Sequence, residues 1–284
     1  MNAYEVVLNQ ILGQLRRGTI PWRSGFNAVP RNYRTGHPYR GINRLILSCA
    51  PYEMPWYLSF KQVQQLGGNI RNGEHGHIVC FFKQVDDEDR DYSVVLRYYR
   101  VWNIAQTTLE PGLTVFAKTE CERIYTDMPD PPALGHDCGI PHYVISQDRV
   151  VLPSIALYEK AEEYYSTLYH ELVHSTGHPK RLMRFEADAP PLEEKESYSL
   201  EELIAEIGAS FLCAETGILP ATIDNNAAYI ANWLRVLENN HAYLFKAAAR
   251  AQQAVDLIRG GDPPPLFFSY WRYPIIPIDP IEPF

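Results

Sequence analysis

The chain has 284 residues, enough for one large domain or two of ordinary size. Its apolar content of 46% and charged content of 21% are typical of a folded globular protein, and the absence of an apolar run of about 18 residues argues against a membrane span. The first ten residues lack the basic cluster and apolar core of a secretory signal, and the five cysteines are scattered without a CxxC pair. We therefore expect reduced thiols and a cytoplasmic protein, not a disulfide framework.

The net charge of -8 conceals a strong asymmetry along the chain. Residues 1–85 contain ten Arg or Lys and three acids, a net charge of +7, so the remainder carries -15. A basic front part joined to an acidic back part indicates two domains with different partners. Nucleic acid is the expected partner of the basic part, and the acidic part is expected to repel duplex DNA.

The front part, residues 1–126, is expected to form an α+β domain. Residues 4–17 place apolar side chains at helical spacing and end in two arginines before Gly18, which predicts an amphipathic helix. The further predicted elements are a short helix over 43–49, a helix over 58–66, strands over 77–83 and 93–104, and a solvated acidic turn over 86–91.

The back part is expected to be mostly helical with a small β element. A Pro/Gly/Asp-rich stretch over 127–141 is the predicted linker, and residues 142–259 form the predicted second domain. The predicted elements are a short hairpin of 143–145 with 149–152, and helices over 155–177, 197–217, 222–240 and 241–259. The proline-rich residues 260–284 are expected to form an extended tail.

The run His170-Glu171-Leu172-Val173-His174 predicts a metal site on the first of these long helices. Residues four apart on a helix project from one face, so His170 and His174 can share a tetrahedral zinc ion, with manganese as an alternative. Glu171 lies one step round the helix, beside the open coordination position. There it is the predicted general base, which takes a proton from water and returns it to the leaving amine.

A catalytic zinc site usually has a third protein ligand. Glu202 and Glu206 lie four residues apart on the next predicted helix, away from its apolar face. This spacing indicates one ligand and one carboxylate that orients a histidine. Tyr198 is a candidate to stabilise an oxyanion, whereas His178 is expected to lie beyond the helix end.

The front part interleaves cations and aromatic rings, as a surface for single-stranded nucleic acid does, because cations follow the phosphates and rings stack on bases. A glycine-rich loop over 67–77 could also bring backbone amides close to a phosphate. Trp56, Tyr57 and Phe81 are expected to lie in the core instead. The candidate nucleic-acid-binding residues are Trp22, Arg23, Arg31, Tyr33, Arg34, Tyr39, Arg40, Asn43, Arg71, Arg97 and Arg100.

Two resemblances refine this interpretation. HExxH followed one helix later by Glu-x-x-x-acid resembles the gluzincin arrangement, which by position implies Glu202 as the ligand and Glu206 as the residue that hydrogen-bonds a histidine. The usual second acid is Asp, so the longer Glu206 leaves open that the two roles are exchanged. The segments 38–43, 67–76 and 99–106, together with 170–178 and 201–206, resemble ArdC-type antirestriction proteins over about residues 1–258.

The second resemblance implies a single-stranded-DNA-binding domain fused to a zincin-like domain, encoded on conjugative plasmids and protecting incoming DNA from restriction. Three hypotheses remain open. In the first, the chain is a DNA-binding antirestriction protein that also cleaves a protein met on DNA, such as a restriction enzyme. In the second, it protects by coating DNA, and its metal site is not catalytic. In the third, it is a cytosolic metallopeptidase whose basic part docks a protein substrate.

Overall fold

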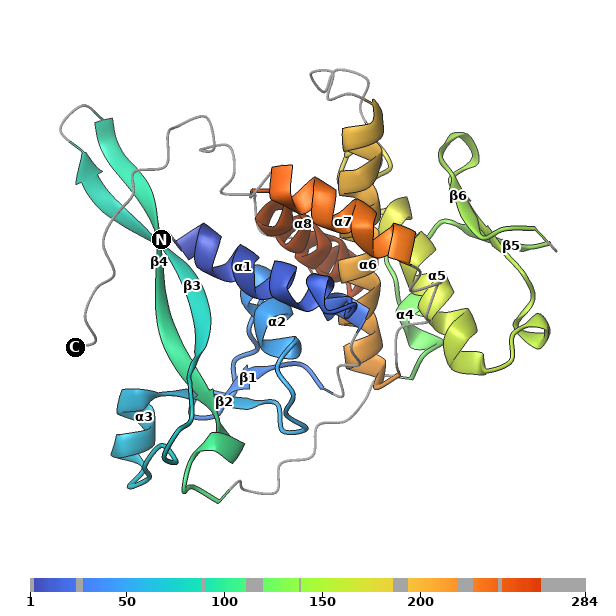
Figure 1. Cartoon of the computed structure of the whole chain (residues 1–284). Coiled ribbons are helices and arrows are strands. Elements are labelled where there is room, and N and C mark those ends of the chain that lie inside the picture. The colour runs from blue at the N-terminus through green and yellow to red at the C-terminus, as the bar shows by residue number, and fades with distance from the viewer. Residues whose placement is uncertain are drawn as a thin grey trace.

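The protein has an α+β fold, as the sequence predicts (Figure 1). The computed structural model describes residues 3–23, 28–87, 90–110, 120–137, 139–185, 194–218, 227–239 and 242–261. Its helices are α1 (Ala3–Arg16), α2 (Gly41–Ser48), α3 (Phe60–Gln65), α4 (Arg123–Thr126), α5 (Ala161–Ser175), α6 (Glu194–Thr216), α7 (Ala227–Asn239) and α8 (Tyr243–Ile258). Its strands are β1 (Arg31–Asn32), β2 (Trp56–Ser59), β3 (His77–Asp87), β4 (Arg90–Asn103), β5 (Ala133–His136), β6 (His142–Val144) and β7 (Arg149–Leu152). The predicted tail lies beyond the described residues.

The front sheet has the strand order β1-β2-β4-β3. Strands β3 and β4 are antiparallel and form a long hairpin that projects beyond the helices (Figure 1). Both strands are confirmed, but they extend into the acidic run that was predicted to be a solvated turn, and Asp87 pairs in register with Arg90. The pairing of these strands therefore continues further along the chain than the acidic run suggested.

The predicted helix over 58–66 is partly wrong, because residues 58 and 59 belong to strand β2. The helix begins only at Phe60, where Ser59 and Gln62 form a capping box. The Ser59 hydroxyl accepts a hydrogen bond from the Gln62 backbone N–H at 3.3 Å, and the Gln62 side chain accepts one from the Ser59 N–H at 2.9 Å. This Ser-x-x-Gln spacing is a recognisable helix start.

The second sheet has the order β5-β7-β6, with β6 antiparallel and β5 parallel to β7. The predicted hairpin of β6 and β7 is confirmed. Part of the stretch predicted as a linker is strand β5, so it is structured there. Gly135 of this strand lies directly against the Arg149 side chain, where a Cβ atom would come within 2.2 Å of a guanidinium nitrogen. The glycine that suggested a loop therefore permits a close contact within a sheet.

The front and back parts of the chain share a continuous hydrophobic core. Helix α1 packs against α7, and α2 packs against α8. The fully buried Trp22 meets Trp233 of α7 edge-on, with ring centroids 5.8 Å apart. The N-terminal helices therefore connect the front sheet directly to the helices of the back part (Figure 1).

The described cysteines Cys49, Cys80, Cys121 and Cys213 are free thiols. Cys80 and Cys213 are buried, as expected for structural cysteines, and burial raises the pKa of each to about 12. Neither is therefore a thiolate at neutral pH. Within the described part of the chain, no helix is both long and apolar enough to cross a bilayer.

Candidate metal centre

Helix α5 carries the histidine pair of the HExxH run and ends at Ser175, two residues before Gly177. The helix was predicted over 155–177, and Gly177 lies just after its observed end. Gly177 also makes a close contact, because a Cβ atom there would lie 2.5 Å from the ring of Phe185. The chain leaving α5 therefore folds back against the helix, which brings Arg184 beside α5 and α6.

Helices α5 and α6 approach each other closely where α6 has a glycine. A Cβ atom on Gly208 would lie 2.7 Å from a methyl group of Val173, so only glycine fits at this spacing without a shift. Val173 precedes His174 on α5, and Gly208 lies less than two turns from Glu202 on α6. The close contact thus lies next to the histidines and lets a carboxylate of α6 reach them.

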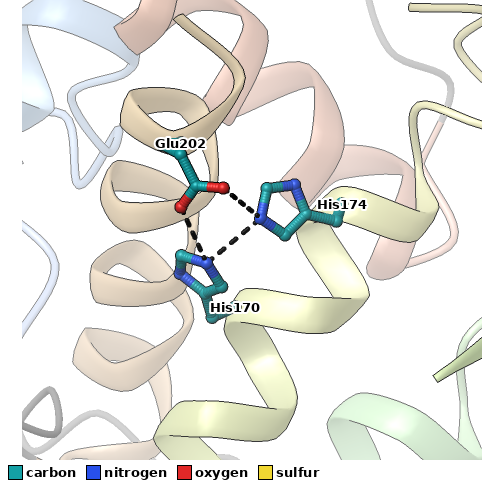
Figure 2. Close-up of side chains that lie close together, drawn as sticks. All are labelled: His170, His174 and Glu202. Carbon is teal, nitrogen blue, oxygen red and sulfur yellow. Dashed lines mark hydrogen bonds and ion pairs between the residues drawn. The ribbon is translucent and has the colours of Figure 1, made fainter. Parts of the chain in front are cut away.

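His170, His174 and Glu202 converge on a common point, as Figure 2 shows. The two Nε2 atoms are 3.1 Å apart, and each lies 3.5 Å from an oxygen of Glu202. Zinc bonds of 2.0–2.1 Å in tetrahedral geometry place neighbouring ligand atoms about 3.3 Å apart. The triangle of donor atoms therefore has the dimensions of one face of such a site.

The charges around the triangle also suit a cation. Burial alone would lower the pKa of His170, but the carboxylates of Glu202, Glu206 and Glu171 outweigh it and raise the pKa to about 9. A histidine that is so readily protonated lies in an excess of negative charge. A divalent ion bound by two imidazoles and a carboxylate would neutralise that excess.

Glu201, which the sequence analysis did not nominate, contacts the second histidine. Its Oε1 lies 3.3 Å from Nδ1 of His174, on the side of the ring away from the donor triangle. Arg184 holds the same carboxylate at 2.6 and 2.9 Å and also donates to the Val173 carbonyl. Burial raises the pKa of Glu201, but Arg184 and His174 lower it more, to about 2. An ionised Glu201 keeps the proton of His174 on Nδ1 and leaves Nε2 free for a metal.

Glu171 is buried, with 6% of its surface exposed, next to the histidines. Burial raises the pKa of its carboxyl group, and the charges of His170 and His174 oppose this only in part. The group therefore accepts a proton more readily than an exposed glutamate does. This property suits the predicted general base.

The remaining candidates around the site differ in position. Glu206 is nearly buried and its charge acts on His170, but the carboxylate whose oxygens meet both Nε2 atoms is that of Glu202. His178 follows the helix end, as expected, and its Nδ1 accepts a hydrogen bond from the Lys180 backbone. The side chain of Tyr198 is outside the described residues.

Two candidates for nucleic-acid contact have structural roles instead. Trp22 is fully buried, so the prediction that its ring stacks on bases is wrong. The amide of Asn43 donates to the Cys80 carbonyl at 2.7 Å and accepts from the Cys80 N–H at 2.6 Å, at the open edge of β3. Tyr33 packs edge-on against Trp56, and Arg40 pairs with Asp256 of α8.

The other cationic candidates lie around the front sheet. The guanidinium groups of Arg31, Arg71 and Arg100 donate to backbone carbonyls of Gly36, Thr107 and Gly76, and Arg34 contacts Gln65. These contacts fix the side chains without neutralising their charge. Tyr39 and Arg97 are half-buried, and the side chain of Arg23 lies outside the described residues. Trp56 and Tyr57 are buried as predicted, whereas Phe81, expected in the core, is 41% exposed.

Comparison with known proteins gives matches to both parts of the chain. The family described as the N-terminal domain of anti-restriction factor ArdC matches residues 1–112, and the family described as zincin-like metallopeptidase matches residues 134–250. An uncharacterized protein of Sinorhizobium fredii is 31% identical over 89% of this chain and 90% of its own length. A DNA primase TraC of Escherichia coli is 28% identical over 90% of this chain but only 27% of the primase.

Solved structures of the antirestriction protein ArdC from plasmid R388 are also similar. The metal-free form has a TM-score of 0.77 and 32% identity, and the match covers 91% of this chain and 97% of that one. The Mn(II)-bound form has a TM-score of 0.76, again with 32% identity, and the match covers 92% and 98% of the two chains. The chain belongs to the ArdC family of antirestriction proteins.

Proposed function

We propose that this protein binds single-stranded DNA without sequence preference, carries a zinc metallopeptidase site, and protects incoming DNA from restriction in the cytoplasm. The observation that carries the enzymatic part is the donor triangle of His170, His174 and Glu202. Its dimensions and surplus negative charge fit a divalent metal, and the related ArdC protein has a Mn(II)-bound structure. The DNA-binding part is supported by the net charge of +7 over residues 1–85.

In this proposal Glu202 is the third ligand, and Glu171 is the general base. His170, His174 and Glu202 would hold a zinc ion, which when bound would supply Lewis-acid chemistry toward a peptide carbonyl and a water molecule. Glu171 takes the proton of the attacking water and returns it to the leaving nitrogen, which its raised pKa favours. Glu201 and Arg184 hold the ring of His174 in the required tautomer and orientation. Manganese is the alternative metal.

The substrate we expect is a protein met on DNA, such as a restriction enzyme. Because one chain carries both a basic sheet and a metal site on a common core, DNA binding would bring the site to proteins on the same strand. The effective concentration of such a protein would then be raised without any contact specific to it.

The substitution Glu171→Gln separates catalysis from metal binding and DNA protection. Removing a general base should lower peptide cleavage by about 100-fold to 10,000-fold while zinc content and oligonucleotide affinity stay unchanged. Cleavage of casein, elemental analysis and fluorescence anisotropy with a labelled oligonucleotide measure these three properties. Transfer of an unmodified plasmid into a restricting host measures protection. Glu162→Gln, an exposed position on the same helix, is the matched control.

Each result selects one function. Lost cleavage together with lost protection supports a protective peptidase. Full protection by Glu171→Gln, with no cleavage by the unaltered protein, means that coating of DNA protects it and that the metal site is not catalytic. Absence of salt-sensitive oligonucleotide binding would contradict the DNA-binding part, and the basic surface would then dock a protein.

A further inference from the structure

The β3–β4 hairpin has two faces, and the strand register assigns side chains to them. Val79 pairs with Tyr99, and Phe81 pairs with Arg97. Directly opposed residues of antiparallel strands point to the same side, and alternate residues of one strand share a side. Phe81, Arg97 and Tyr99 therefore lie on one face, whereas Cys80 points to the other and is buried in the main core.

This face is covered at one end and open at the other. Val79 and Val101 are fully buried against Leu47 of α2. Two residues further along each strand, on the same face, the rings of Phe81 and Tyr99 are 41% and 45% exposed. Their centroids are 5.9 Å apart and their planes differ by 60°. Two adjoining aromatic rings are thus partly exposed on this face of the hairpin.

We propose that the Phe81–Tyr99 face, made of Phe81, Arg97 and Tyr99, is where single-stranded DNA stacks its bases. This inference rests on the DNA binding proposed above and identifies the surface of the protein that contacts the DNA. Exposed rings on neighbouring strands give bases flat surfaces on which to stack, as in other sheet proteins that bind single strands. The bases of a duplex are stacked on each other, so their faces are not available to such a surface.

The charges near this face fit a polyanion. Arg97 lies directly beside Phe81 in the register, and its buried Nε finds no acceptor among the described residues. Residues 1–85, which include β3 only as far as Val85, carry a net charge of +7. Binding without sequence preference requires aromatic rings that stack on bases and nearby cations that contact phosphates.

The experiment compares Phe81→Thr and Tyr99→Thr with the unaltered full-length protein, since threonine is well accepted in strands. Fluorescence anisotropy measures binding of a labelled oligo(dT) and of an abasic strand of the same length. Each substitution should weaken oligo(dT) binding by about 5-fold to 150-fold, the loss expected for one stacked base. Binding of the abasic strand should be equal for all variants. Tyr99→Phe should bind oligo(dT) like the unaltered protein.

Phe60→Ala is the matched control. Phe60 is also an exposed ring of the front part, at 49%, but it begins α3 and packs beside Trp102. Trp102 alternates with Val101 along β4 and points to the opposite face. Phe60→Ala should therefore leave oligo(dT) binding unchanged.

Salt dependence gives a second, independent readout. Arg97→Gln should reduce the slope of log affinity against log salt by about 0.7, the value for one phosphate contact with a single strand. Phe81→Thr and Tyr99→Thr should lower the affinity and leave that slope unchanged, because neither removes a charge.

Failure of this inference and failure of the proposed function give different results. If the unaltered protein binds oligo(dT) and both threonine variants bind it equally well, the Phe81–Tyr99 face is not the site, although DNA binding stands. The same conclusion follows if Phe60→Ala causes the larger loss. If the unaltered protein binds neither strand, DNA binding itself is refuted, and the assignment of this face with it.

Discussion

Glu201 and Glu202 are adjacent in the sequence yet contact different atoms of the site. Successive residues on a helix project about 100° apart, so one carboxylate meets the donor triangle and the other passes to the far side of His174. Arg184 then fixes Glu201 through two charged hydrogen bonds. A bidentate pair of this kind restrains orientation more strongly than a single contact does.

Arg184→Gln should weaken metal binding by about 10-fold to 100-fold, the usual loss when a residue that positions a metal-bound histidine is released. Competition with a chromophoric chelator measures the affinity for zinc without reference to activity. Arg123→Gln is the control, because it breaks an exposed Arg–Asp pair within α4. Equal zinc affinity for Arg184→Gln and the unaltered protein would show that His174 needs no such support.

At the scale of elements, the metal site depends on how closely α5 and α6 pack. Gly208 and Val173 set that spacing, and the buried Arg44 of α2 secures the far end of α6. Arg44 pairs with Glu215 at 3.1 Å and lies 4.3 Å from the centroid of the Phe211 ring. Helix α6 is thus held near its middle and near its C-terminal end by groups from other elements.

Gly208→Ala should lower the free energy of unfolding by about 1–3 kcal/mol, because the new methyl group overpacks the contact with Val173. The higher helix propensity of alanine should offset up to about 1 kcal/mol of that loss. The substitution should also weaken zinc binding, because α6 must move away from the histidines. Urea unfolding and chelator competition measure the two effects. Gly13→Ala in α1 is the control, because the new Cβ atom would meet no other atom closer than 3.6 Å. This substitution should therefore stabilise the protein slightly through helix propensity.

The double variant Gly208→Ala with Val173→Ala checks the cause. Removing the two Val173 methyl groups makes room for the new Cβ, so zinc affinity should recover even if some stability does not. If the double variant folds but its zinc affinity stays low, the spacing between α5 and α6 is not the reason why Gly208 is needed for zinc binding.

The sequence predicts what is local in this site and misses what depends on packing. Spacing alone places His170, Glu171 and His174 together, because a helix fixes their relative directions. The gluzincin-like spacing nominates Glu202 and Glu206 but not Glu201, because the contact of Glu201 with His174 depends on the rotation of α6 against α5. The same limit applies to Trp22 and Phe81: Trp22 is covered by α1, α6 and α7, whereas Phe81 stays exposed on the hairpin.

At the scale of the whole molecule, the front and back parts are joined by buried surface and not only by the chain. The core-facing residues of α1, among them Val7, Ile11 and Leu15, belong to the same cluster as the residues of α5, α6 and α8. The expected division into domains at 1–126 and 142–259 therefore cuts through a common core.

The full-length protein should unfold in one cooperative transition by calorimetry, because neither part can lose its structure without exposing the other's core. Zinc should raise the midpoint of that transition, since it binds only the folded state. A fragment of residues 1–126 should be poorly soluble, with the apolar side of α1 exposed. Two well-separated transitions in the intact chain would contradict this description.

The hydrogen bonds of Asn43 have a consequence for how the molecules behave together. The outermost strand of an open sheet offers unsatisfied peptide groups to any extended chain, including an identical one. At Cys80 the Asn43 amide imitates a neighbouring peptide group, with one donor and one acceptor, and so occupies that position. Asn43 of helix α2 therefore prevents another extended chain from pairing with β3 at this position.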